Sequence, residues 1–455
     1  MPAILLLVGA IAAFVLAGRM NERLLDLRRE HGLDQAEPLE NAPPLVAFTT
    51  VALGGFRGVL ADLLWLRATE LQDEGKYFEL VQLADWITKL EPRFTSIWAF
   101  HAWNLAYNIS VLFDDPADRW RWVRHGIRLL RDEGLRYNAG SAPLYRELGW
   151  LFQHKVGAAY DQAHLYYKRA WAREMTEALE GPAPNYERLL GPVAGAPEAR
   201  ERLRRLTGLD AAAMRSADEQ YGPLDWRLPQ AHALYWALQS RKYAKDFDVL
   251  AADRMVFQSL ADAFREGRLF EDAAEDVFVP SPNLDLLPRV QAAFRQTLEA
   301  QPDEPTVNEA YRNFLSQAVV LLYTYHRTRD ARTLFEELAG RYPSDDTASG
   351  FDAFVVGAFA ARVQDAHPNE ALAFVEGALY QSLWWFALGD TARGEGFEEL
   401  AGLCWRTYME AHADPAARER IGLPPLPQIR EQARRRVLEA LRSPAARSRV
   451  APPRH

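Results

Sequence analysis

The sequence predicts an all-helical protein built from antiparallel helix pairs. Apolar residues recur at steps of three and four through most of the chain, as they do along one face of a helix. The segments with this spacing are separated by short turns containing glycine or proline, and no stretch shows the two-residue alternation typical of a strand. With 455 residues, of which 49% are hydrophobic, the chain has ample material for a core.

The chain begins with an uncharged apolar run, residues 2–18, which stops at Arg19. As a helix this run would be about 25 Å long, slightly short of the ~30 Å hydrocarbon core of a bilayer. No basic residue precedes it, which favours a transmembrane anchor over residues 1–19. The short length and the small residues around Val15-Leu16-Ala17 leave a cleaved signal peptide open. Residues 20–44 are expected to form a linker.

The charges beside this run indicate its orientation. Four arginines follow it and no basic residue precedes it; they are Arg19, Arg23, Arg28 and Arg29. Positive-inside counting therefore favours a single-pass membrane protein with its body in the cytoplasm. A body on the outer side, as in many anchored repeat proteins of bacteria, stays open.

A second apolar run, residues 45–66, is interrupted by Gly54-Gly55, Arg57 and Asp62. Charges at its centre make it a poor membrane span. We expect a buried helix that caps the helical stack. A re-entrant or interfacial segment beside the anchor is the alternative.

The clearest helical pattern covers residues 61–112. Its three apolar stripes are Ala61, Leu64, Trp65, Ala68 and Leu71, then Leu80, Leu83, Ala84, Ile87 and Leu90, then Trp98, Ala102, Leu105 and Ile109. Gly75 closes the first helix and Pro92 closes the second, so neighbouring helices are expected to run antiparallel.

This arrangement resembles a tetratricopeptide repeat, a unit of about 34 residues. Ala68 falls on the small-residue position where two helices cross, Tyr77 on the aromatic position after the turn, and Pro92 on the terminal proline. The resemblance is clearest over 61–112, 143–175 and 306–343. It implies an irregular, tetratricopeptide-like α-solenoid that binds protein partners on its concave surface.

The remaining divisions follow from composition. Residues 45–180 are expected to form N-terminal repeats, and residues 230–415 C-terminal repeats. Between them, residues 181–229 contain many prolines and glycines and are expected to form an irregular insertion ending in an aromatic turn. Residues 416–455 are strongly basic and are expected to form a helix followed by a disordered tail from Pro444.

Candidate binding residues come from the first repeats. Trp98, Asn104 and Tyr107 are expected to grip a protein segment on the concave face. Four arginines at helical spacing predict a ridge for an anionic partner or lipid headgroups; they are Arg121, Arg124, Arg128 and Arg131. The alternative is a solvated face neutralised by neighbouring acids such as Asp118, Asp132 and Glu133.

No catalytic, cofactor or metal motif is recognisable. His154 and His164 are expected in separate helices without a metal, and Cys404 as a small buried residue. Residues 389–396, GDTARGEG, lack the Gly-Lys-Ser/Thr ending of a phosphate loop and are expected to form an interhelical turn. The net charge of -9 argues against nucleic acid as the main partner.

The sequence therefore favours a membrane-anchored scaffold or assembly factor that binds proteins, held in the membrane by residues 2–18. One alternative is an enzyme with its site where the insertion meets the solenoid, for example a hydrolase of cell-wall glycans. Another is an accessory protein that handles anionic lipids or polysaccharides through Arg121 to Arg131 and the basic tail.

Overall fold

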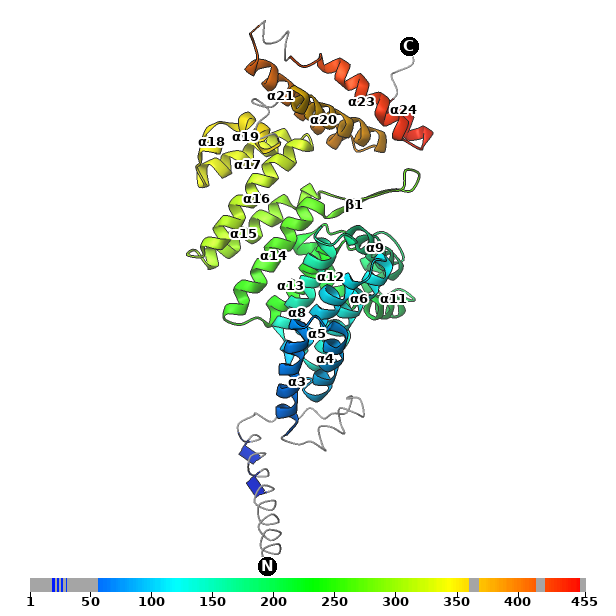
Figure 1. The fold of residues 1–455 in the computed structure, drawn as a ribbon, viewed down its shortest axis with the longest axis vertical. Coiled ribbons are helices and arrows are strands. Elements are labelled where there is room, and N and C mark those ends of the chain that lie inside the picture. Colours follow the sequence, from blue (N-terminus) through cyan, green and yellow to red (C-terminus); the bar gives the residue numbers. More distant parts are fainter. Residues whose placement is uncertain are drawn as a thin grey trace, which may run out of the picture. The chain divides into compact units, whose positions relative to one another are not determined.

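A computed structural model describes residues 56–359, 368–414 and 422–450, together with six residues between 19 and 30 (Figure 1). The chain divides into two compact units, residues 1–92 and residues 93–455, which we describe separately. The division falls at Pro92, inside the 61–112 stretch that the sequence treats as continuous. The expected anchor, residues 2–18, lies outside the described residues. No helix among the described residues is long and apolar enough to cross a bilayer.

The described part of the first unit is a helical hairpin. It consists of α3 (Phe56–Asp73) and α4 (Tyr77–Leu90), joined by a turn in which Gly75 has a φ of +71°. A connection this short makes the two helices antiparallel. Their contact face is apolar and fully buried, and includes Ala68, Leu71, Leu80, Ala84 and Ile87. The helix pair expected here is confirmed.

The other face of α3 is exposed. Val59, Leu63 and Leu66 are 57%, 60% and 62% exposed. Residues 45–55 of the second apolar run lie outside the described residues. For residues 56–66 the expectation of a buried helix is wrong on this face, because the α3–α4 contact uses only one apolar stripe of a segment that is apolar on more than one side.

The second unit begins with three long helices, each of which continues from α-helical into π-helical geometry. The first comprises α5 (Thr95–Trp103), η2 (Asn104–Ile109) and the 3-10 turn η3 (Ser110–Leu112); the second comprises α6 (Pro116–Arg128), η4 (Leu129–Gly134) and α7 (Leu135–Tyr137); the third comprises α8 (Ala142–Trp150) and η5 (Leu151–Gly157). α9 (His164–Leu179) follows. π-Helical turns are rare and concentrate at functional sites.

Residues 181–229 are more regular than expected. They contain α10 (Tyr186–Leu190), α11 (Ala196–Thr207) and α12 (Ala211–Tyr221). Each of these short helices begins directly after a residue that is common in turns. Asn185 and Asp210 cap two of the helices by accepting hydrogen bonds from backbone N–H groups. Because such residues also mark loops, the composition of this region predicted an irregular segment. The aromatic turn that ends this region is part of the core, because Trp226 is completely buried.

The rest of the unit is a series of helices interrupted by one hairpin. The helices are α13 (Pro229–Tyr243), α14 (Phe247–Glu266), η6 (Leu284–Leu286), α15 (Leu287–Ala300), α16 (Pro305–Thr324), α17 (Thr328–Arg341), α18 (Asp345–Ala348), α19 (Phe351–Phe359), α20 (Pro368–Leu388), α21 (Thr391–Ala411), α23 (Leu426–Ala440) and α24 (Pro444–Val450). α13–α14, α16–α17 and α20–α21 are tightly linked pairs that pack together. One continuous apolar core runs through this region and includes Cys404, which is buried as expected.

Two strands were not expected from the sequence. β1 (Arg268–Asp272) and β2 (Val277–Ser281) pair antiparallel, with Phe270 opposite Val279. The strands have five residues each and β2 contains Pro280, so neither shows a clear alternation of apolar and polar residues.

The basic C-terminal segment is ordered further than expected. The helix α24 covers residues expected to be disordered, and its Arg449 donates a hydrogen bond to the carbonyl oxygen of Ala387 at 2.8 Å. The buried carboxylate of Glu275, in the β-hairpin turn, accepts hydrogen bonds from the backbone N–H groups of Arg442 and Ser443. These contacts fix the segment, and sequence composition does not reveal them.

Candidate functional site: an apolar groove and a polar cavity

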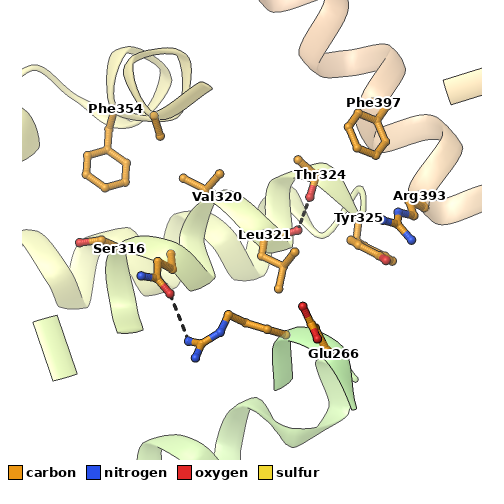
Figure 2. Close-up of a pocket in the computed structure, with 12 residues that line it drawn as sticks. Glu266, Ser316, Val320, Leu321, Thr324, Tyr325, Phe354, Arg393 and Phe397 are labelled. Atoms are coloured by element: carbon orange, nitrogen blue, oxygen red, sulfur yellow. Dashed lines mark hydrogen bonds between the residues drawn. The ribbon is translucent and has the colours of Figure 1, made fainter. Parts of the chain in front are cut away.

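An apolar groove of about 550 Å³ lies within the second unit, between α14, α16, α19 and α21. Its lining residues are Arg265, Glu266, Ser316, Gln317, Val320, Leu321, Thr324, Tyr325, Phe354, Ala358, Arg393 and Phe397. Figure 2 shows α16 along the floor, with Phe354 on one wall and Phe397 on the other. Volumes of this size are typical of ligand sites, and the mostly apolar lining fits an apolar guest.

Most charges at the rim of the groove are already paired. Arg265 forms an ion pair with Asp262 and donates to Gln317 at 3.1 Å. Glu266 pairs with Lys168, whose side chain is 3% exposed, at 3.1 Å. The rim can therefore be covered by a partner without leaving these charges uncompensated.

Arg393 is held by aromatic rings. Its guanidinium lies 3.6 Å from the centre of the Trp385 ring and 5.2 Å from that of Tyr325. Burial lowers the pKa of Arg393 below its ordinary value and raises the pKa of Tyr325. Arg393 belongs to the GDTARGEG segment, residues 389–396, which was expected to form an interhelical turn. Only Gly389 and Asp390 form that turn. The helix α21 begins at Thr391 because the Asp390 side chain caps its N-terminus.

One wall of the groove is fixed by direct contact between backbones. A Cβ atom at Gly396 of α21 would lie 2.0 Å from the carbonyl oxygen of Thr324, at the end of α16. No side chain fits there, so the two helices approach as closely as their backbones allow.

A second, polar cavity of about 340 Å³ lies where η2 and η5 approach each other. Its lining residues are Tyr107, Val111, Arg119, His154, Lys155, Tyr160, Asp161 and Gln162. Tyr107, expected to bind a partner, therefore borders a cavity, and its hydroxyl is 3.0 Å from Nδ1 of His154. Sequence reasoning noted His154 and missed Lys155 and Asp161. Neither a single lysine directly after His154 nor an isolated aspartate forms a recognisable motif.

Trp98 and Asn104 are not available to a partner. They are 1% and 0% exposed. Trp98 stacks on Tyr137 with ring centres 6.0 Å apart, and Asn104 donates to the carbonyl oxygen of Phe100 at 2.9 Å and accepts from Asn108 at 2.7 Å. Their expected place on a concave surface is wrong, because both lie on the buried side of the helix that contains η2.

The four arginines do not form one ridge. Arg121 is exposed and pairs with Asp118, Arg124 pairs with Glu174 at 3.1 Å, and Arg128 is exposed. The side chain of Arg131 is only 6% exposed, pairs with Asp132 and donates to the carbonyl oxygen of Leu206. Arg131 is buried against the segment that contains Leu206, and the alternative of charges neutralised by neighbouring acids fits the ion pairs of Arg121, Arg124 and Arg131 better.

Within the described ranges, no group of three or more His, Cys, Asp or Glu side chains is placed to hold a metal ion. A further cavity in the region expected to be an insertion is lined by Tyr186, Glu187, Leu190, Gly191, Pro192, Val193 and Arg215. Glu187 is the one acidic side chain among these residues, so the carboxylate pair that glycan hydrolysis uses is not found in this cavity.

The repeat architecture follows from the helix pairs themselves. Over residues 306–343, α16 and α17 are joined by three residues, and the second helix buries Ala331 and Phe335 before ending at Arg341, two residues ahead of Pro343. Ala331, Phe335 and Pro343 are separated by steps of four and eight residues, as are Leu80, Ala84 and Pro92 in the first unit. The chain contains tetratricopeptide-like helix pairs.

Comparison with known proteins adds little to this architecture. No protein-family model matches the chain, and no curated protein matches it. Among solved structures, the crystal structure of the P58(IPK) TPR domain aligns over 83% of this chain and 98% of that one, at 12% identity and a TM-score of 0.17. A superposition this poor supports no argument, so the assignment rests on the helix pairs.

Proposed function

We propose that the protein is an interaction scaffold whose groove between α16, α19 and α21 receives an apolar segment of a partner protein. The observation that carries this proposal is the apolar groove itself, in which Val320, Phe354 and Phe397 face one volume of about 550 Å³. Covering such a surface releases water from apolar area, and the paired rim charges limit the cost of binding.

The fold is compatible with this role. Helical repeats offer extended surfaces on which other proteins bind, although a fold alone names no partner. An amphipathic helix with apolar residues on one face is the guest that fits a groove between helices. We propose such a segment as the ligand.

Site-specific photocrosslinking tests the proposal. A photoreactive residue at Ser316, which lines the groove, should capture a defined partner in native cells, whereas the same residue at exposed Glu309 on α16 should not. Val320→Glu should abolish the Ser316 crosslink and weaken binding of the purified partner at least tenfold, because it places a charge in an apolar contact. Equal crosslinking from both positions, or unchanged binding by Val320→Glu, would contradict the proposal.

We further propose that residues 2–18 anchor the scaffold in a membrane, with its body in the cytoplasm and its partner in a membrane complex. The uncharged run, the arginines that follow it and the exposed apolar face of α3 support this placement. The full chain should resist extraction by alkaline carbonate, and a chain lacking residues 1–19 should be released. A topology reporter fused after His455 should report the cytoplasmic side. Extraction of the full chain by carbonate would contradict the membrane anchor, and a reporter on the outer side would contradict the cytoplasmic body.

A further inference from the structure

The polar cavity beside η2 and η5 is lined by charged and aromatic side chains that have no part in the groove. Its centre is the carboxylate of Asp161, 6% exposed, which accepts from four donors: Arg119 at 3.2 Å, Lys155 at 2.6 Å, Tyr167 at 3.0 Å and the backbone N–H of Ala163 at 2.9 Å. A carboxylate has about four acceptor positions, so Asp161 is saturated.

The two cations around Asp161 are not saturated. Among the described residues, Lys155 makes this one hydrogen bond although its ammonium has three protons, and its side chain is 4% exposed. The ammonium also lies 5.1 Å and 5.9 Å from the ring centres of Tyr107 and Tyr167, contacts that an anionic acceptor can supplement. Arg119 uses Nε toward the carbonyl oxygen of Phe113 and Nη1 toward Asp161, and no described residue accepts from its Nη2. Donors therefore remain for a ligand that brings acceptors.

The charge balance favours an anion. Arg119 and Lys155 carry two positive charges against the single negative charge of Asp161; burial lowers the pKa of Lys155, and its hydrogen bond to Asp161 opposes this shift and favours the ammonium form. Burial lowers the pKa of His154, with a smaller contribution from Lys155, so the imidazole adds no charge near neutral pH. Glu147 acts electrostatically on Tyr107, but burial raises its pKa and it does not line the cavity. The lining keeps one net positive charge.

Aromatic rings form the other side of the cavity. His154 lies between Trp150 and Tyr160, with ring centres 4.7 and 4.9 Å away, and Tyr107 stacks on Trp103 at 5.4 Å. Tyr160 is 82% exposed, an unusual position for an aromatic ring unless something covers it. A volume of about 340 Å³ lies within the range of small-molecule sites and so admits a small organic molecule.

We propose that this cavity binds a small organic monoanion with a flat unsaturated body. Its anionic group accepts hydrogen bonds from Arg119 and Lys155, and its body lies against Tyr107 and Tyr160. This inference is independent of the groove, which lies on other helices of the same unit, and goes beyond the scaffold function.

Three probes separate charge from shape. Benzoate has both features, benzamide has the same shape without charge, and inorganic phosphate has charge without a flat body. Titrated into the full-length protein by calorimetry, benzoate should bind at least tenfold more tightly than either other probe, because an ionised acceptor strengthens the hydrogen bonds and the ring adds stacking. Equal affinity for benzoate and benzamide, or tighter binding of phosphate, would overturn the proposal. So would the absence of benzoate binding up to about 10 mM, a concentration at which even weak specific sites fill.

Two variants locate the binding. Tyr160→Ala, at an exposed position that folding does not need, should weaken benzoate about fivefold, as expected for the loss of one aromatic contact. Tyr166→Ala, exposed on α9 outside the cavity, is the matched control and should change nothing. Arg119→Gln should weaken benzoate at least tenfold and leave benzamide unchanged, with circular dichroism verifying the fold. Val320→Glu in the groove should leave benzoate binding intact. Benzoate affinity that ignores both Tyr160 and Arg119 would place the probe elsewhere and refute the assignment.

Discussion

Nε2 of His232 lies 2.8 Å from the carbonyl oxygen of Trp226, so the ring donates this hydrogen bond from Nε2. The other nitrogen, Nδ1, is buried and has no partner among the described residues. The ring is completely buried between Phe152, Trp171 and Trp226. Protonation would put a proton on Nδ1 that nothing accepts, so the folded protein holds this histidine neutral.

The free energy of unfolding should therefore decrease as the pH is lowered through a defined window. Burial lowers the pKa of His232 to about 4, whereas an unfolded histidine titrates near 6.5. The unfolded state binds a proton first as pH falls, so stability is full above about pH 6.5 and declines toward pH 4, by about 3 kcal/mol in total. Urea unfolding from pH 7 to 4.5 measures the slope. His232→Gln should flatten it and exposed His125→Gln should not; equal slopes in all three proteins would show that another group controls it.

Asp218 should be a major stabilising residue of the second unit. Its half-buried carboxylate accepts from Nε1 of Trp226 at 2.8 Å, from the backbone N–H of Leu224 at 3.0 Å and from the hydroxyl of Tyr186. Asp218→Ala leaves these donors unpaired and should cost about 2–4 kcal/mol in the free energy of unfolding. Asp210→Ala, which removes only the N-cap of α12, should cost about 1 kcal/mol. Similar losses from the two variants would contradict this ranking.

Two glycines of α21 should respond oppositely to the same substitution. Gly396→Ala places Cβ against the Thr324 carbonyl and should destabilise by about 3 kcal/mol or more. At Gly402 the nearest atom to a new Cβ is the flexible end of Arg406, at 3.3 Å, so alanine should be neutral or stabilise by up to about 1 kcal/mol through helix propensity. Thermal unfolding of both variants tests the pair; a harmless Gly396→Ala would mean that α16 and α21 are not in backbone contact.

Glu275 should control the C-terminal helix. Glu275→Ala leaves two backbone N–H groups unpaired and should release α24. Limited proteolysis with trypsin should then cut faster after Arg447 and Arg449, whereas Glu271→Ala, at an exposed ion pair on β1, should not change the cutting rate. An unchanged cutting rate in the Glu275 variant would show that the packing of α24, and not Glu275, holds this helix in place.

The helix pairs could be predicted because their signals are local. The stripe Trp98, Ala102, Leu105 and Ile109 is buried throughout, and Gly75 and Pro343 mark real helix ends. The exposed binding face could not be predicted, because tertiary packing decides which polar side chains are buried. Asn104 is completely buried, and the side chain of Arg131 is only 6% exposed and donates to the carbonyl oxygen of Leu206, 75 positions away.

Neither site could be found from the sequence, for a different reason. The groove combines Arg265, Phe354 and Phe397, which are separated by up to 132 positions and are brought together only by the order in which helices stack. In the cavity, Lys155 and Asp161 are close in sequence, but their meaning depends on Arg119 and on burial. Packing of this kind depends on the whole unit and cannot be predicted from the spacing of apolar residues.

The contact between Gly396 and Thr324 also sets a mechanical limit. Where side chains separate two helices, a guest can widen a groove by changing rotamers; here backbone meets backbone, and no softer layer exists to compress. The Phe397 wall therefore stands at a fixed spacing from the α16 floor. The width of the groove is therefore the same with and without a bound partner. We expect the groove to discriminate between segments of different thickness more strictly than a groove whose walls can move.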